Sequence, residues 1–343
     1  MPAGPFRSPN PGTRALGGHL CTRVCDLLDC RYPVVLAGMG GVARSELVAA
    51  ITNAGGFGFL GMVREPPSLI RKEVQAVRRA TSQRFGVNLI PAATDSELLE
   101  RQLRMCIDLA VPVVALFWEL VPDVVERLRD AGILVVYQVG SAKEAETAQR
   151  AGAHILITQG VEAGGHVRGT TPLKRLLSEV IASSDVPVLA SGGIVDGRDV
   201  ADALSSGADG VVIGTAFLAS PESFAHEYHK ERIVTARSQE TLLTDMFHIN
   251  WPIGAPVRVL QNSATQGLRG DPFGPKSVIG EEEGRPIYLF STDSPLRSMT
   301  GDFEAMALYA GQGVDRIDAI IPAGDRLRAI VAEAQRLLFT GGD

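Results

Sequence analysis

A histidine closes the most distinctive glycine-rich segment of this sequence. His166 ends the string Gln-Gly-Val-Glu-Ala-Gly-Gly-His over 159–166, directly after a short aliphatic stretch. An imidazole with an unperturbed pKa of about 6.5 can exchange a proton near neutral pH, or hold an anionic oxygen by a hydrogen bond. Because the Ala-Gly-Gly before it supports neither a helix nor a strand, the segment has the composition of a loop shaped for a ligand. His166 is therefore the strongest single candidate for chemistry.

Two further glycine turns have the composition of a phosphate site. Ser191-Gly192-Gly193-Ile194 follows one aliphatic stretch, and Gly214-Thr215 follows the next and opens a predicted helix. Glycine allows close approach to backbone N–H groups, and the start of a helix favours an anion. The two turns together predict a bound phosphate group. The alternative is a pair of turns that hold no ligand.

The other histidines and the cysteines carry weaker signals. His226 and His229 are three residues apart on a predicted helix, where a solvated helix face is a simpler interpretation than a metal site. The spacing of Cys21, Cys25 and Cys30 is not the Cys-x-x-Cys pairing of a zinc site. We therefore predict no metal, and reduced thiols of the kind found in a cytoplasmic protein.

A repeated unit of helix and strand must position these turns. Four times between residues 32 and 220, a helical stretch ends in Ala-Gly or a close variant, and a short apolar strand follows. Glycine just past a helix end takes the left-handed conformation that terminates the helix. Strands that are apolar on both faces are typical of a parallel sheet covered by helices. With two more strands that begin after a proline, the predicted strands are 33–37, 57–60, 85–90, 112–116, 133–139, 154–158, 187–191 and 209–213.

Eight strands alternating with helices predict an α/β fold of the (β/α)8 TIM barrel class. A doubly wound open sheet is the alternative, but its phosphate-binding glycines would follow the first strand, whereas the richest glycine clusters here come late. The barrel is expected over 31–220, after a flexible Pro- and Gly-rich tail at 1–30. Residues 221–343 are expected to form a smaller, mostly helical domain over the strand ends. Its helical patterns cover 221–248, 300–312 and 323–339.

Composition excludes several functional classes. The 343 residues are 45% hydrophobic and 21% charged, with a net charge of −6, and such a chain is not wholly disordered. No basic stripe marks a nucleic-acid-binding surface, and no apolar run reaches the ~18 residues that a membrane helix needs. We therefore expect neither nucleic acid nor a membrane as a partner.

With these motifs in view, the chain resembles the nitronate monooxygenase family, formerly called 2-nitropropane dioxygenases. The string over 159–166 is the most specific part of the match. The other matching pieces are PVVLAGMGG at 33–41, NAGGFG at 53–58, FGVNL at 85–89, SGGI at 191–194, GTAF at 214–217 and, near the family's C-terminal end, AGQG at 310–313.

The resemblance implies a barrel flavoprotein that holds FMN without a covalent link and oxidises nitronates with O2 to a carbonyl compound and nitrite. A homodimer is one assembly that the resemblance allows. The FMN site would include Ser191, with the phosphate on Gly192, Gly193, Gly214 and Thr215. Flavin-ring contacts would come from Ala37, Gly38, Met39, Asn88, Gln138 and Gln159, with Gly164 and Gly165 beside the ring. His166 would be the catalytic residue that faces the substrate.

Three departures from the family's pattern leave other activities open. Leu36 replaces a common glutamine, Leu116-Phe117-Trp118-Glu119 replaces a His-Phe-Gly of several members, and Gln138 stands where some relatives place lysine by the flavin. Related barrels with a similar loop are FMN-dependent enoyl-acyl-carrier-protein reductases and NADH:quinone reductases, which take hydride from a nicotinamide. A non-catalytic flavin-binding subunit is the alternative of a different class.

Overall fold

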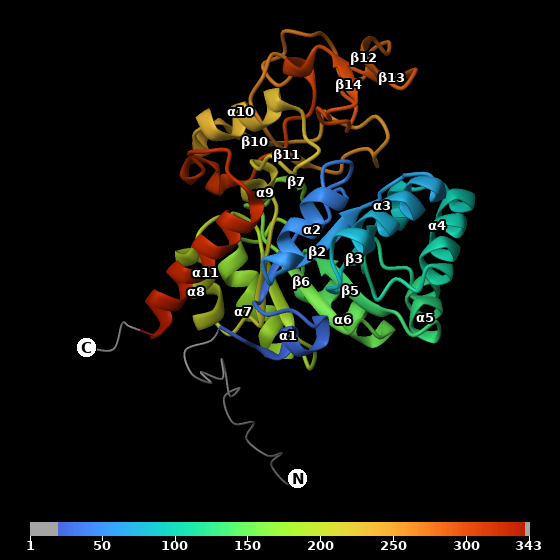
Figure 1. The fold of residues 1–343 in the computed structure, drawn as a ribbon. Helices are drawn as coiled ribbons and strands as arrows, with labels where there is room; N and C mark the ends of the chain where they lie inside the picture. The colour runs from blue at the N-terminus through green and yellow to red at the C-terminus, as the bar shows by residue number, and fades with distance from the viewer. Residues whose placement is uncertain (1–19, 340–343) are drawn as a thin grey trace, which may run out of the picture.

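Eight parallel strands form a closed barrel at the centre of the molecule (Figure 1). The computed structural model describes residues 20–339. Each barrel strand pairs with the next, and β1 also pairs with β9, which closes the ring. The predicted (β/α)8 fold is confirmed. The barrel strands are β1 (Val34–Leu36), β2 (Phe57–Gly61), β3 (Gly86–Leu89), β4 (Val113–Leu116), β5 (Leu134–Val139), β6 (Ile155–Gln159), β8 (Val188–Ser191) and β9 (Gly210–Ile213).

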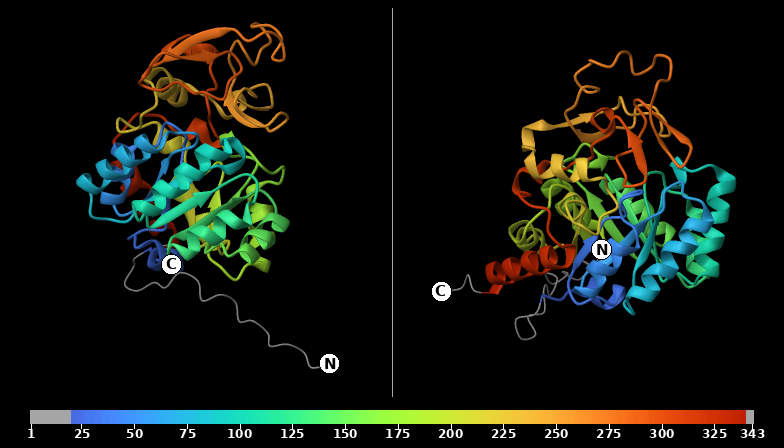
Figure 2. Two further views of the ribbon diagram at one scale, coloured as in Figure 1. Left: turned by 90° about the vertical axis from the view of Figure 1, so that its right-hand side faces the viewer. Right: turned by 45° about the horizontal axis from the view of Figure 1, so that its top comes forward.

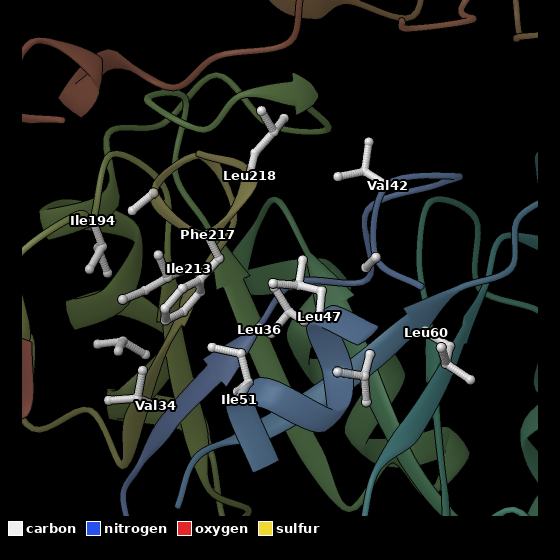
Figure 3. Packing of buried hydrophobic residues seen from close by; sticks show 14 of the residues in the cluster. Val34, Leu36, Val42, Leu47, Ile51, Leu60, Ile194, Ile213, Phe217 and Leu218 are labelled. Carbon is white, nitrogen blue, oxygen red and sulfur yellow. The ribbon is translucent and has the colours of Figure 1, made fainter. Parts of the chain in front are cut away.

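Side chains of the strands alternate between the inside of the barrel and the helices around it. Val35 and Phe57 belong to a cluster inside the barrel, with alternate residues of the other strands. Leu36 points the other way and belongs to the outer cluster with Leu47 and Phe217, part of which is drawn in Figure 3. Burial on both faces explains why the strands are almost wholly apolar.

Helices cover the outside of the barrel. After β9 comes only α9 (Thr215–Leu218), a helix of four residues. Its place in the outer layer is taken by the C-terminal helix α11 (Ala323–Phe339), which packs against both α8 and α2 (Figures 1 and 2). None of the helices within residues 20–339 has the length and apolar character of a membrane span. The other helices of this layer are α2 (Ser45–Asn53), α3 (Pro67–Ala80), α4 (Ser96–Asp108), α5 (Pro122–Asp130), α6 (Ala142–Ala151), α7 (Leu173–Ser183) and α8 (Gly197–Ser205).

The four Ala-Gly repeats end helices as predicted. Gly152 follows α6 with a φ of 100°, and its N–H donates to the carbonyl groups of Ala148 and Gln149. The corresponding glycines of the other repeats, Gly55, Gly132 and Gly207, also have positive φ. This left-handed backbone is costly for other residues, so the repeats fix where each helix stops.

A short helix lies under the amino ends of the barrel strands, within the stretch expected to be a tail. In α1 (Arg23–Leu28), the side chains of Val24, Cys25 and Leu28 are buried in the cluster that fills the barrel. Arg23 forms an ion pair with Asp209 at 2.8 Å. The ordered protein therefore begins before residue 30, and residues 1–19 of the predicted tail lie outside the described residues.

A cap covers the carboxyl ends of the strands, as Figure 2 shows. It is formed by the chain between α9 and α11 together with part of the loop after β6, and contains α10 (Glu227–Thr235). It also contains two three-stranded sheets, whose strands the sequence patterns missed. One sheet has the order β10 (Thr241–Thr244), β11 (Val257–Leu260) and β7 (Gly165–His166), and the other β13 (Arg285–Tyr288), β12 (Val278–Glu282) and β14 (Met299–Gly301).

The helix predicted over 300–312 is wrong. This stretch holds the end of β14, a 3-10 turn over Phe303–Ala305 and an isolated bridge between Val259 and Tyr309. Its apolar residues face the cap core and the neighbouring strands instead of one helix face. Tertiary pairing has therefore overridden the local pattern.

Candidate active site

A cavity of about 470 Å³ lies between the carboxyl ends of the barrel strands and the cap. Its size is in the range of about 300–1,000 Å³ that small-molecule sites occupy. All the site residues predicted from the sequence line it, although they come from six different strand ends. They are Ala37, Gly38, Met39, Asn88, Gln138, Gln159, Gly164, Gly165, His166, Ser191, Gly192, Gly193, Gly214 and Thr215.

The turns after β8 and β9 have the geometry expected where a phosphate approaches the backbone. Gly192 and Gly193 have φ of 118° and 71°, a pair of conformations that side chains disfavour. The hydroxyl oxygen of Thr215 accepts the N–H of Gly311 at 3.0 Å, which ties the 310–313 segment to this end of the cavity. Since α9 has only four residues, the turns themselves, more than a helix dipole, would carry anion binding.

The charges of the cavity wall are segregated. The charged side chains that line it come from the loop after β2 and from the cap, and none comes from the turns after β8 and β9. They are Arg64, Glu65, Glu282, Arg285 and Asp293. A dianionic phosphate would therefore meet no lining carboxylate at the glycine turns, and the residues present fit such a group.

Gly38 and Asn88 lie very close together at the other end of the predicted cofactor site. A Cβ on Gly38 would lie 2.2 Å from the Cβ of Asn88, so no side chain fits there. The side-chain amide of Asn88 donates to the carbonyl oxygen of Ala115 at 3.3 Å, which holds Asn88 across the mouth of β3 and β4. The glycine keeps the segment over 37–39 close to this amide and leaves room beside it.

The loop that carries His166 is fixed by hydrogen bonds, not flexible. Gln159 donates through Nε2 to the carbonyl oxygen of His166 at 2.9 Å and accepts the N–H of Arg168 through Oε1 at 3.2 Å. His166 also lies in β7, opposite Val257 of β11. From the same strand, Arg258 donates to the carbonyl oxygen of Val161 at 2.9 Å. Gln159 thus positions His166 from inside the barrel, and β11 holds it from the cap.

Aromatic rings surround the imidazole of His166. The ring of Trp251 lies 3.5 Å away between centroids, and the rings of Tyr309 and Trp118 lie 5.6 and 6.4 Å away. Nε2 of His166 is buried and has no hydrogen-bond partner among the described residues. An unpartnered buried polar atom is costly, and the residue that carries this one lines the cavity.

Burial controls the charge of this imidazole. It lowers the pKa of His166 from its usual 6.5 to about 3, and the positive charge of Arg64 lowers it further in the same direction. An imidazole near its usual pKa could exchange a proton at neutral pH, whereas burial in this wall disfavours the charged form. His166 is uncharged at neutral pH and can act as a hydrogen-bonding group there.

Sequence reasoning missed the cap side of the cavity. Arg64, Asn250, Trp251, Thr292 and Tyr309 line it, yet no motif surrounds them in the sequence. The only signal was the departure at 116–119. Phe117 lines the cavity, and its neighbour Trp118, with φ of 82°, packs edge-on against Trp251.

The weaker histidine candidates lie outside the cavity wall. Nδ1 of His226 accepts the N–H of Tyr228 and caps α10, while Nε2 of His229 contacts the carbonyl oxygen of Tyr309 at 3.1 Å. His248 stacks on Phe273 with ring centroids 4.7 Å apart. No cluster of three or more His, Cys, Asp or Glu side chains suited to a metal ion occurs within residues 20–339.

Comparison with known proteins settles the family. Residues 22–333 match the nitronate monooxygenase family. The chain belongs to this family. A probable nitronate monooxygenase of Staphylococcus aureus is 31% identical over 361 residues, covering 92% of this chain and 98% of the relative. A (3aS,4S,5R,7aS)-5-hydroxy-7a-methyl-1-oxo-octahydro-1H-indene-4-carboxyl-CoA dehydrogenase of Mycobacterium tuberculosis is 34% identical over 253 residues, covering 73% of this chain and 69% of the relative.

Two solved structures share the whole architecture. FabK from Thermotoga maritima has a TM-score of 0.81 at 30% identity, over 94% of this chain and 98% of that one. A nitroalkane oxidase from Streptomyces ansochromogenes has a TM-score of 0.73 at 30% identity, over 92% of this chain and 99% of that one. With the family membership, these similarities make the chain an oxidoreductase of the flavin-dependent type.

Proposed function

We propose that this enzyme binds FMN in the cavity and oxidises alkyl nitronates with O2 to a carbonyl compound and nitrite. The observation that carries the proposal is that two features lie in the wall of the same cavity. One is the pair of glycine turns at 191–194 and 214–215, which present no lining carboxylate to a phosphate. The other is the uncharged, unpartnered imidazole of His166 in the same cavity wall.

The predicted residues would hold FMN at two ends. Ser191, Gly192, Gly193, Gly214 and Thr215 would bind the phosphate through backbone N–H groups and hydroxyls. The ring would lie among the residues at and just after the carboxyl ends of β1, β3, β5 and β6. These are Ala37, Gly38, Met39, Asn88, Gln138, Gln159, Gly164 and Gly165. When bound, FMN supplies the electron transfer and oxygen chemistry, while the protein supplies orientation and electrostatics.

His166 would hold the nitronate. Its neutral imidazole can donate from Nε2 to an anionic oxygen, and it meets no competing partner for that bond. The ring of Trp251 packs against the imidazole, with the two ring centroids 3.5 Å apart. Phe117 adds an apolar wall for the alkyl part of the substrate.

The decisive test is anaerobic mixing of the yellow protein with propionate 3-nitronate and, separately, with NADPH. We expect the visible absorbance of the flavin to fall with the nitronate and to stay unchanged with NADPH. Heat denaturation should release FMN and not FAD, because no adenosine-binding βαβ unit follows the first strand. Protein that cannot be loaded with FMN would refute the cofactor assignment.

A nicotinamide-dependent reductase is the second candidate. The similarity to FabK and to a CoA-ester dehydrogenase favours it. In that case NADPH would bleach the flavin without oxygen, and the nitronate would not. The same two anaerobic samples therefore separate both candidates.

A further inference from the structure

Arg64 is a positively charged residue of the cavity wall, and the proposed function gives it no role. It lies in the loop after β2 and lines the cavity with His166 and Tyr309. Its φ is 59°, in the left-handed region that residues other than glycine seldom adopt. Such a conformation persists only where surrounding structure fixes it, and it is often found at ligand-binding positions.

The guanidinium group of Arg64 has only weak and uncharged partners. Nη1 donates to the carbonyl oxygen of Asn250 at 3.3 Å, and Nη2 donates to the hydroxyl of Thr292 at 3.5 Å. Both distances exceed the usual value of about 2.9–3.0 Å. Nε is buried and has no partner among the described residues. These contacts place the group between barrel and cap without satisfying its donors.

The other charged side chains of the cavity wall lie in direct ion pairs. Glu65 pairs with Arg44 at 2.7 Å, and Arg285 pairs with Glu282 at 2.7 Å and with Asp293 at 3.1 Å. Within residues 20–339, no carboxylate lies within salt-bridge distance of Arg64. A buried or half-buried charge without a counter-charge is unfavourable. Because Arg285 pairs with two carboxylates, the wall carries no excess positive charge. Among the described residues, Arg64 is the lining cation outside an ion pair, and its donors stay open to an anionic ligand.

Arg64 also lies close to the predicted reacting end of the cavity. Its charge acts on both His166 and Tyr309, whose rings are 5.6 Å apart. The phosphate turns, by contrast, follow β8 and β9, and Arg64 contacts the cap segments at Asn250 and Thr292. This placement favours a substrate group over the FMN phosphate as its partner.

We propose that Arg64 binds an oxyanion of the substrate, a carboxylate or a nitronate, and so makes the cavity selective for anionic substrates. The planar guanidinium matches such a group, because its N–H donors can form two parallel hydrogen bonds with the two oxygens. The inclusion of nitronate rests on the proposed function, whereas the carboxylate does not.

Tryptophan fluorescence can report this binding without turnover. The chain has two tryptophans, Trp118 and Trp251, whose rings lie 5.1 Å apart, with Trp251 against His166. We would titrate the FMN-loaded protein with propionate, propyl-1-nitronate, inorganic phosphate and uncharged propionamide. We expect propionate and the nitronate to bind more tightly than propionamide.

Arg64→Gln removes the charge but keeps hydrogen-bonding groups for Asn250 and Thr292. A hydrogen bond to a charged group contributes about 1.5–3 kcal/mol, so we expect this variant to weaken propionate binding by about 10–150-fold and to leave propionamide unchanged. Arg64→Lys should recover part of the loss. Arg101→Met, on the exposed face of α4, removes a distant positive charge and should change nothing.

The outcomes separate this proposal from the proposed function. Propionate binding that depends on Arg64, without nitronate oxidation, would support the oxyanion site and refute the function. Nitronate oxidation with an unchanged KM in Arg64→Gln would refute the oxyanion site and keep the function. Loss of FMN retention in this variant would assign Arg64 to the cofactor, and Arg64-dependent binding of phosphate alone would identify a phosphorylated ligand; both would overturn the proposal.

Discussion

At the scale of the residue, the most informative feature of the cavity is the pair of buried polar atoms that lack hydrogen-bond partners. Nε2 of His166 and Nε of Arg64 are both buried without a hydrogen bond among the described residues, and both residues line one cavity. One group is neutral because burial lowers its pKa, and the other stays charged because a guanidinium does not deprotonate in proteins. The pair is suited to hold an anion without adding a proton to it.

This pairing predicts how substitutions at His166 differ. A nitronate enters already deprotonated, so His166 needs only to donate a hydrogen bond, which asparagine can also do. We expect His166→Asn to retain FMN and to lose less than about 10-fold in kcat/KM, and His166→Leu to lose about 10–150-fold, the value of a hydrogen bond to a charged group. Rapid-mixing flavin reduction by the nitronate measures both. A loss of about 10²–10⁴-fold in kcat for the asparagine variant would instead indicate proton transfer by the imidazole.

Buried histidines also predict how stability depends on pH. Burial lowers the pKa of His166 to about 3 and of His229 to about 4, from a usual 6.5. Below pH 6.5 the unfolded chain therefore binds protons that the folded chain does not. The two neutral histidines therefore stabilise the folded protein fully above about pH 6.5. This stabilisation is lost as the pH falls toward the pKa values of the folded protein, by up to about 1.4 kcal/mol per pH unit for each histidine.

His229→Gln isolates one of these two contributions. Glutamine can still donate to the carbonyl oxygen of Tyr309, the partner of His229, but it does not titrate. Between pH 6.5 and 5, we expect the free energy of unfolding of this variant to fall less steeply with pH than that of the wild type. The difference between the two slopes should correspond to close to one bound proton. Urea unfolding at several pH values measures the slope. Equal slopes would show that His229 is protonated in the folded protein.

At the scale of the element, short turns bring the site together. The strands and the ends of their helices could be predicted, because the apolar runs and glycines such as Gly152 act locally. The cap strands could not, since β7 has only two residues and finds β11 about ninety positions later. The predicted loop residues all reach the cavity, because a barrel places every strand's carboxyl end at one face. Trp251 was not predictable, because it belongs to the cap, and Arg64 was not predicted, because no motif marks the loop after β2 in the sequence.

The glycine turns give a prediction at this scale. Gly193→Asp and Gly214→Asp place a carboxylate where a phosphate would approach, so we expect FMN retention to be lost while the apo protein still folds. Gly267→Asp controls for the left-handed backbone alone: its φ of 75° is close to the 71° of Gly193, but nothing lies within 4 Å of its added Cβ, whereas a Cβ on Gly193 would lie 3.2 Å from that of Glu162. FMN content and thermal unfolding of each variant check this. A loss of folding in Gly193→Asp that the control does not share would show that the turn is structural.

At the scale of the whole molecule, the cap is an insertion and the C-terminal helix completes the barrel. The helix over 323–339 was predicted, but it was assigned to the second domain, because sequence order gives no sign of which layer it joins. In the structure α11 packs on α8 and α2. Glu333 accepts the N–H of Gly197 at the start of α8, at 2.9 Å. The outer layer of the barrel is thus completed by a helix that follows the cap in the sequence.

Two leucines of α11 test how much the barrel depends on this helix. Leu327 is fully buried, and its side chain lies against Gly56 at the start of β2, where an added Cβ would approach it to 2.6 Å. Leu337, on the same helix, is 47% exposed. If α11 is part of the barrel core, Leu327→Ala should lower the free energy of unfolding by about 2–5 kcal/mol, as buried leucines do elsewhere, whereas Leu337→Ala should change it by no more than about 0.5 kcal/mol. Urea unfolding followed by far-UV circular dichroism measures both variants.

Because the barrel holds the predicted FMN site, the Leu327 variant should also lose bound FMN at lower urea concentrations than the wild type. Similar small effects for both leucines would mean that α11 only rests on a barrel that is stable without it.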